Sequence, residues 1–160
     1  MRARPLIFLS TYEGKMDEKN RISIPASFRT VIESKGDNCI YAYCSFINSC
    51  IEVCTSEKIN KLQSFLDEMD MFSMEKDAIA TAVLSDCEPL QFDSKGRVSL
   101  PERLVKFANL KKEIFFAGKG QTFEIWPKDQ FSSYYSKARK LAKETSILKK
   151  KRTNDSDNKD

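Results

Sequence analysis

The chain has 160 residues, of which 27 are Lys or Arg and 23 are Asp or Glu, and it carries a formal net charge of +4. Apolar residues make up 41%, and Gly and Pro number five each, a globular composition that excludes collagen-like, low-complexity and wholly disordered classes. No apolar run approaches the ~20 residues that a membrane-spanning helix requires, so we expect no membrane partner and a cytoplasmic protein.

Little in the sequence supports catalysis or metal binding. The chain contains no histidine, which excludes Ser–His–Asp and Cys–His catalysis within it. The five cysteines include no Cys-x-x-Cys pair, so we expect reduced, buried thiols of apolar character and no zinc site. A glycine-rich phosphate-binding loop is also missing. We therefore predict a protein that is not an enzyme and that uses no cofactor, metal or small-molecule substrate.

Short strands and a short helix are predicted along the first part of the chain. Residues 22–24 alternate apolar, polar and apolar, which is typical of a half-buried strand, and Pro25 suits the first turn of a helix. The predicted elements are strands over 12–16, 22–24, 40–44 and 50–54 and a helix over 26–34.

Two longer helices are predicted next. Ser56 is a suitable N-cap for a helix that runs to about Met69, and a second helix covers 74–87. Apolar residues at helical spacing predict that one face of each helix contacts the core or another subunit. These residues are Ile59, Leu62, Phe65, Leu66 and Met69 on the first helix, and Ile79, Val83 and Leu84 on the second.

The remaining elements repeat the opening pattern and end in a last helix. Strands are predicted over 90–92, 98–100, 113–117 and 122–126, with a helix over 102–107. Pro127 is expected to open the final helix. Its apolar side carries Phe131, Tyr134, Tyr135, Ala138 and Leu141.

The chain contains an internal repeat. Residues 17–25 match residues 93–101 with five of nine positions identical, namely Asp, Lys, Arg, Ser and Pro. A second match joins residues 50–54 to 122–126, in the same order along the chain. Two collinear matches indicate two copies of one structural unit.

The repeated segment has the pattern Asp-x-Lys-[Gly/Asn]-Arg-aliphatic-Ser-aliphatic-Pro. Gly and Asn tolerate positive φ, which predicts a tight turn, and the preceding Asp can accept hydrogen bonds from the turn and pair with the Arg four residues later. Arg reads guanine bidentately and Lys suits phosphate, although a purely structural turn would also retain Asp and Gly. The candidate DNA-binding residues are Lys19, Arg21, Lys95 and Arg97, and the turn-orienting residues are Asp17, Asn20, Asp93 and Gly96.

Positive charge concentrates near the C-terminal end. Residues 137–152 include eight basic residues and one acidic residue, a net charge of +7, whereas residues 1–136 have a net charge of −1. The segment 145–160 is polar and lacks periodicity, so we expect it to be disordered. It could contact nucleic acid phosphates without sequence preference, or serve only as a solvated tail.

Residues 93–101 resemble the signature of the MraZ family, whose domains are of the SpoVT-AbrB type. Similarity extends from about Phe8 to Ala142, with residues 12–25 resembling the opening pattern and 123–126 the end of the second unit. The resemblance implies an α+β, mostly β fold in which two pseudo-repeated units form a swapped-hairpin barrel with flanking helices. Asn20 departs from the family pattern, which has Gly there.

The same resemblance implies a sequence-specific transcriptional regulator that binds double-stranded DNA at its own promoter, ahead of cell division and cell wall genes. It further implies a ring-shaped homo-oligomer associated with the nucleoid. The alternative is a protein-interaction module, antitoxin-like or a scaffold, using the same barrel. The expected organisation is a first unit over 8–56, connecting helices over 57–87, a second unit over 88–130, a C-terminal helix over 131–144 and a tail over 145–160.

Overall fold

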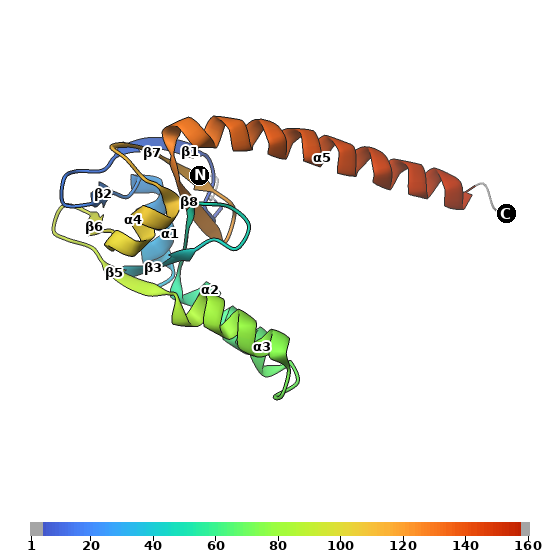
Figure 1. Cartoon of the computed structure of the whole chain (residues 1–160), viewed down its shortest axis with the longest axis horizontal. Coiled ribbons are helices and arrows are strands. Elements are labelled where there is room, and N and C mark those ends of the chain that lie inside the picture. Colours follow the sequence, from blue (N-terminus) through green and yellow to red (C-terminus); the bar gives the residue numbers. More distant parts are fainter. Residues whose placement is uncertain (1–4, 158–160) are drawn as a thin grey trace. The chain divides into compact units, whose positions relative to one another are not determined.

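The computed structural model describes residues 5–157 as an α+β structure rich in antiparallel strands (Figure 1). The chain divides after Pro127 into a strand-rich unit and a unit formed by one helix. The strand-rich unit contains β1 (Thr11–Lys15), β2 (Arg21–Ser23), α1 (Ala26–Ser34), β3 (Cys39–Cys44), β4 (Ile51–Cys54), α2 (Ser56–Asp67), α3 (Met74–Ile79), the π-helix η1 (Ala80–Ser85), β5 (Glu88–Gln91), β6 (Arg97–Ser99), α4 (Glu102–Ala108), β7 (Glu113–Gly118) and β8 (Thr122–Pro127). The helix of the second unit is α5 (Lys128–Asp157).

The two repeats build their sheets jointly. The larger sheet has six strands in the order β1-β7-β8-β4-β3-β5, and a smaller sheet pairs β2 with β6. Strand β1 of the first repeat pairs with β7 of the second, and β5 pairs with β3 of the first, all antiparallel. Strands β4 and β8 join the halves at the centre of the sheet. Neither repeat therefore has a sheet of its own.

The strands do not close into the expected barrel. Within residues 5–157 the six-stranded sheet ends at β1 on one side and β5 on the other, and these two strands are not paired. The strands that follow them along the chain, β2 and β6, pair with each other as a separate sheet. Each of these two strands begins after one of the tight turns, and neither extends the larger sheet.

One apolar core lies between the sheets and the short helices of both repeats. Phe28 of α1 is 1% exposed and packs against Phe8 and Phe123, with ring centroids 5.2 and 4.8 Å away. Leu104 of α4 is fully buried in the same cluster. Helix α1 follows the predicted bounds and α4 ends one residue later than predicted. Both helices thus bury their apolar face against strands from the two halves.

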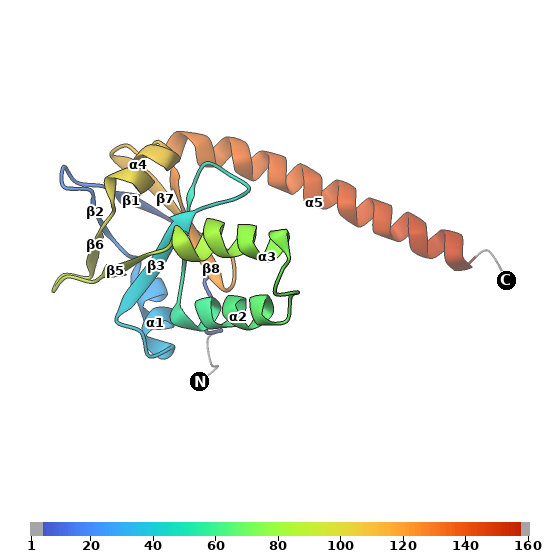
Figure 2. The ribbon, with the colours of Figure 1, turned by 60° about the horizontal axis from the view of Figure 1, so that its bottom comes forward.

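The longer helices differ in detail from the prediction. Figure 2 shows α2 beside the α3–η1 segment, and Ile59 and Leu62 pack near Val83. Thr55, not Ser56, occupies the N-cap, because the Ser56 hydroxyl and backbone N–H instead donate to the carboxylate of Asp37.

The helix predicted over 74–87 is α-helical only to Ile79 and continues as the π-helix to Ser85.

The apolar face predicted on α2 is only partly buried. Leu66 is 2% exposed, whereas Phe65 is 56% exposed. Near the connection to α3, Met71, Phe72 and Met74 are also exposed.

The final helix is longer than predicted. Helix α5 extends to Asp157, whereas disorder was expected from residue 145; residues 158–160 lie outside the described part. The expectation of disorder over 145–157 is therefore corrected. Missing periodicity argues against a packed apolar face, but it does not prevent local i to i−4 hydrogen bonds among residues of high helix propensity such as Lys, Leu and Arg.

Three of the five cysteines are buried as predicted, and Cys44 and Cys87 are half-buried. All five are free thiols, and Cys39, Cys50 and Cys54 are buried. Burial raises the pKa of Cys54 to about 12 and that of Cys44 and Cys87 to about 11. These thiols therefore stay protonated near neutral pH.

Within residues 5–157, no helix combines the length and apolarity needed to cross a membrane, and no cluster of acidic or cysteine side chains is arranged to hold a metal ion.

The anchoring of the small sheet can be tested through stability. Ile22 is 1% exposed, so replacing it by Ala leaves a cavity and is expected to lower the free energy of unfolding by about 2–5 kcal/mol. The neighbouring Ser23 is exposed, and Ser23→Ala is the matched control, with an expected change within about 0.5 kcal/mol. Denaturant titration measures both; equal effects would mean that β2 is not anchored in the core.

Candidate nucleic-acid interface

The small sheet brings the two repeated motifs into one two-stranded ribbon. Arg21 lies opposite Ser99, Ile22 opposite Val98, and Ser23 opposite Arg97. Ile22 and Val98 are each 1% exposed and point into the core. Because side chains alternate along a strand, both arginines and both serines lie on the opposite, outward face. The ribbon therefore presents Arg21 and Arg97 on one accessible surface.

The first turn is held by Asp17. Its Oδ1 accepts hydrogen bonds from the backbone N–H groups of Lys19 and Arg21, at 3.0 and 2.8 Å. Its Oδ2 accepts from Nε of Arg21 at 2.7 Å. Asn20 has φ 59°, the positive value predicted for this position. One carboxylate thus fixes both the backbone of the turn and the direction of the arginine.

The second turn repeats this arrangement. Asp93 Oδ1 accepts from the backbone N–H groups of Lys95 and Arg97, both at 2.9 Å, and Oδ2 accepts from Arg97 Nε at 2.8 Å. Gly96 has φ 73°. The pairing of Asp with Arg and the positive φ predicted from the sequence are confirmed in both turns.

The same contacts lower the pKa of both carboxylates. The pKa of Asp17 lies below its ordinary 3.8, mainly because the carboxylate accepts a hydrogen bond from the backbone N–H of Arg21. The Arg21 guanidinium and the Lys19 N–H lower this pKa further, and together these contacts outweigh partial desolvation, which raises it. The backbone hydrogen bond from Arg97 has the corresponding effect on the pKa of Asp93. Both aspartates are therefore ionised at neutral pH, which keeps each ion pair intact.

Each braced arginine retains donors for another molecule. The aspartates engage the Nε atoms, and the Nη groups of Arg21 and Arg97 have no hydrogen-bond partner among residues 5–157. An arginine held through Nε can direct its two Nη groups end-on toward a planar pair of acceptors. The exposed Lys19 and Lys95 flank these positions. The ribbon can thus donate several directed hydrogen bonds to an external acceptor.

The two turns differ in their surroundings. Asn20 Nδ2 donates to Glu102 Oε2 at 2.9 Å, which ties the first turn to the start of α4. The second turn instead contacts Arg29 of α1, because a Cβ built on Gly96 would lie 2.5 Å from Arg29 Nη1. Neither Arg29 nor Glu102 was predicted from the sequence as a site residue. Both contacts join segments that are far apart in the chain, and no spacing signals them.

All eight residues singled out from the repeat lie in the ribbon and its turns. The backbone N–H of Ile24 donates to the Gly96 carbonyl at 3.3 Å, and that of Leu100 donates to the Asn20 carbonyl at 2.8 Å. Each turn therefore lies beside the end of the other repeat's strand. The structure brings the two sets together; their role toward DNA remains a prediction.

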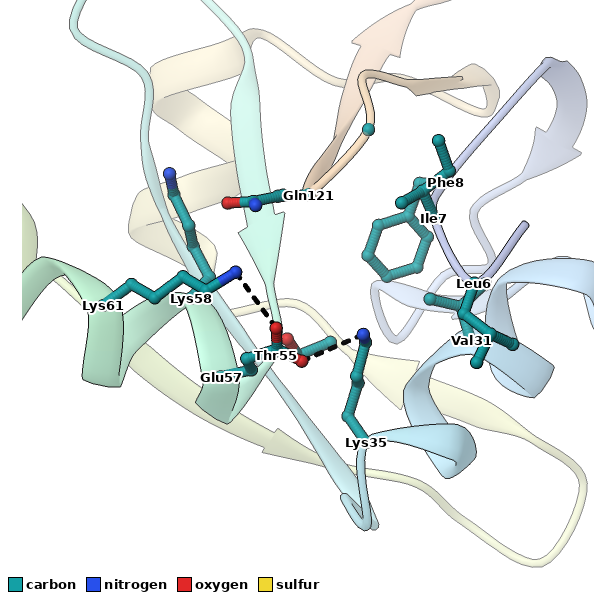
Figure 3. A pocket seen from close by; sticks show the side chains of 11 residues that line it. Leu6, Ile7, Phe8, Val31, Lys35, Thr55, Glu57, Lys58, Lys61 and Gln121 are labelled. Atoms are coloured by element: carbon teal, nitrogen blue, oxygen red, sulfur yellow. Dashed lines mark ion pairs between the residues drawn. The ribbon is translucent and has the colours of Figure 1, made fainter.

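A separate cavity of about 200 Å³ lies between the N-terminal segment, α1, α2 and the β7–β8 turn (Figure 3). Leu6, Ile7 and Phe8 form part of its apolar side. Glu57 at its edge pairs with Lys35 at 2.9 Å and Lys61 at 3.0 Å. No residue of the ribbon lines this cavity.

The fold and the ribbon define a two-repeat α+β protein whose halves share one core and display paired, aspartate-braced arginines. The family model described as "MraZ protein, putative antitoxin-like" matches residues 7–81 and 84–154. The chain belongs to the MraZ family, as its repeated motif predicted, and the match falls in two consecutive segments, one for each repeat.

Relatives of known name cover most of the chain. A protein of Pelagibacter ubique (strain HTCC1062) named transcriptional regulator MraZ is 45% identical over 136 residues, 85% of this chain and 88% of the relative. Proteins with the same name from Rickettsia africae (strain ESF-5) and Rickettsia typhi (strain ATCC VR-144 / Wilmington) are 41% and 39% identical over 138 residues, 86% of this chain and 93% of each relative.

The bracing predicts a pH-dependent stability. The folded-state pKa of Asp17 and Asp93 lies below 3.8, so their contribution is present above that pH and is lost as the pH falls through the folded value. The stability deficit of an Asp17→Asn, Asp93→Asn double variant relative to wild type should therefore be largest near pH 6 and shrink below pH 4.

Thermal unfolding across this pH range measures the effect. The corresponding Ala variants are the controls: they lose the acceptor oxygen that Asn keeps, and they should remain the less stable pair at every pH. A deficit of Asp→Asn that does not change between pH 6 and pH 3 would contradict the ion-pair contribution.

Proposed function

We propose that the protein is a sequence-specific regulator of transcription that binds double-stranded DNA through the β2–β6 ribbon. The observation that supports this most directly is the pair of outward arginines, each held through Nε by its own aspartate with both Nη groups available. A bidentate arginine is the commonest reader of guanine O6 and N7 in the major groove. Fixing the guanidinium in advance lowers the entropy lost on binding.

The dimensions of the ribbon suit this groove. The major groove admits a two-stranded β-ribbon, and several DNA-binding proteins use one there. Arg21 and Arg97 are diagonal neighbours across the two strands, since Arg21 lies opposite Ser99 and Arg97 opposite Ser23. Diagonal positions are roughly 7–8 Å apart, about two base-pair steps of ~3.4 Å. Lys19 and Lys95 would contact the phosphates at either side.

The named relatives support the regulatory role, because each is called a transcriptional regulator. We propose that the regulated DNA is the protein's own promoter, upstream of cell division and cell wall genes, and that the protein acts in the cytoplasm at the nucleoid. The basic residues over 137–152, with a net charge of +7 from eight basic residues and one acidic residue, would add contacts to phosphate that do not depend on sequence. Footprinting on DNA upstream of the gene tests the choice of target.

The arginines are tested by substitution. Arg21→Ala and Arg97→Ala are each expected to weaken binding to the target DNA by about 1–3 kcal/mol per site, because a bidentate base contact is lost. Lys58→Gln, a change of one charge at the cavity away from the ribbon, is the matched control. Fluorescence anisotropy with target and scrambled duplexes measures both affinity and sequence preference.

An Arg21→Ala, Arg97→Ala double variant that is folded and keeps wild-type target affinity would refute the proposed interface. A wild-type protein that shows no preference for any DNA sequence would favour the alternative, a protein-interaction module. Salt titration distinguishes sequence-specific binding from purely electrostatic binding to DNA, since the latter disappears at high salt.

We further propose that the chain assembles into a ring-shaped homo-oligomer, with the exchanged strands of each subunit in a swapped-hairpin arrangement. Phe72 is 88% exposed, Met74 87% and Met71 75%, near the end of the α2–α3 hairpin. Apolar side chains clustered at an exposed position mark a protein contact. Several ribbons in one ring would bind repeated DNA sites with increased avidity.

Sedimentation velocity tests assembly. Wild-type protein at micromolar concentration is expected to sediment as a closed oligomer, and Phe72→Ser should shift it toward smaller species by removing apolar contact area. The control is Asp70→Asn, a change at a nearby polar position. A stable wild-type monomer would contradict the proposed assembly.

A further inference from the structure

Arg29 is a charged side chain with no hydrogen-bond or ion-pair partner in the described part of the chain, residues 5–157. It lies on α1, one residue after the buried Phe28, and is itself half-buried. Its Nε is inaccessible to solvent and has no hydrogen-bond acceptor, and no ion pair to Arg29 is present among residues 5–157. A guanidinium is charged at all physiological pH values, and partial burial without an acceptor has a free-energy cost. Because Nε is closed to solvent, the contact that another molecule can make is with the Nη groups, which also donate to no side chain or backbone group within residues 5–157.

The position of Arg29 indicates which kind of acceptor another molecule would bring to it. A Cβ at Gly96 would lie 2.5 Å from Arg29 Nη1 and 3.1 Å from Cζ, so the guanidinium lies directly against the second turn. Lys95 and Arg97 flank that glycine. The second turn and its neighbour Arg29 therefore include three basic residues, and the only carboxylate of this copy of the motif, Asp93, is already paired with Arg97.

The first turn has no such group. The repeat aligns Gly96 with Asn20 and Arg29 with Val105, an apolar residue that is 8% exposed. The first turn is instead contacted by Glu102, through Asn20. The charged residues of the first turn, counted with Glu102, are two basic and three acidic, for a net charge of −1. Those of the second turn, counted with Arg29, are three basic and one acidic, for a net charge of +2.

We propose that Arg29 is a further DNA-binding residue, which donates to a backbone phosphate beside the second turn and makes the two ends of the ribbon unequal. This inference rests on the proposed function. The second turn then supplies most of the electrostatic attraction of the ribbon, and the first turn, fixed by the Asn20–Glu102 hydrogen bond, acts mainly in reading bases. Gly96 is required because any side chain there would displace the guanidinium.

The two turns offer a matched exchange of residues. Gly96→Asn places in the second turn the residue that the first turn carries, and Asn tolerates the φ of 73° at that position. It displaces Arg29 at little structural cost, since the close atoms belong to the flexible end of a side chain. Lys58→Gln, which removes one charge at the cavity away from the ribbon, is the control for a change of charge alone.

The experiment measures binding of full-length wild type, Arg29→Gln, Gly96→Asn, their double variant and Lys58→Gln to target and random duplexes between about 50 and 200 mM salt. Loss of one phosphate contact is expected to weaken binding to both duplexes about three- to tenfold. It should also reduce the magnitude of the slope of log binding constant against log salt concentration by about 0.9 per engaged subunit. Gly96→Asn should reproduce this effect, the double variant should add nothing further, and Lys58→Gln should retain the wild-type slope.

Other results overturn the inference. A folded Arg29→Gln with the wild-type slope and affinity would show that Arg29 does not contact phosphate, while loss of binding in the Arg21 and Arg97 variants would leave the proposed function standing. Absence of ribbon-dependent binding in wild type refutes both. Additive effects of Arg29→Gln and Gly96→Asn would show that the turn does not position Arg29. Should Arg29→Gln fail to fold, Arg29→Met, which keeps an unbranched stem without charge, provides the same comparison.

Discussion

The antiparallel pairing of β2 with β6 is the interaction on which the rest of the molecule depends. It places Ile22 opposite Val98 inside the core and, by the alternation of a strand, both arginines outside. The same pairing sets each turn beside the other repeat's strand end. A shift by one residue would expose the apolar pair and bury the charged one, so the core fixes the register of the outward face.

The aspartates link this backbone arrangement to the proposed chemistry. Each carboxylate divides its oxygens, one for the N–H groups of the turn and the other for the arginine. A turn of correct shape and an arginine of fixed direction are therefore consequences of a single residue type at a single position. The two repeats reach the same geometry with Asn20 in one and Gly96 in the other, because both residue types accept positive φ.

Local sequence signals predicted most of what is local in this structure. The positive φ of Asn20, the Asp17–Arg21 pair and the bounds of α1 follow from turn chemistry and short-range pattern. The contacts of Glu102 and Arg29 with the turns were not predicted, because they depend on how two helices pack against a ribbon built from both halves. The π-helical segment and the length of α5 were also missed. The first depends on packing, and the second on helix propensity in a stretch whose sequence lacks apolar periodicity.

The exchange of strands between repeats has a consequence for synthesis of the chain. Strand β1 ends at Lys15 and its partner β7 begins at Glu113, so roughly 5–20 s of translation separate them at ~5–20 residues per second. During that interval the first repeat has unpaired strand edges and no second half to bury Ile22. Pairing between such distant segments is slow to form. A chain that stops after the first repeat would be an unfolded target for proteases or aggregation, rather than a half-sized regulator.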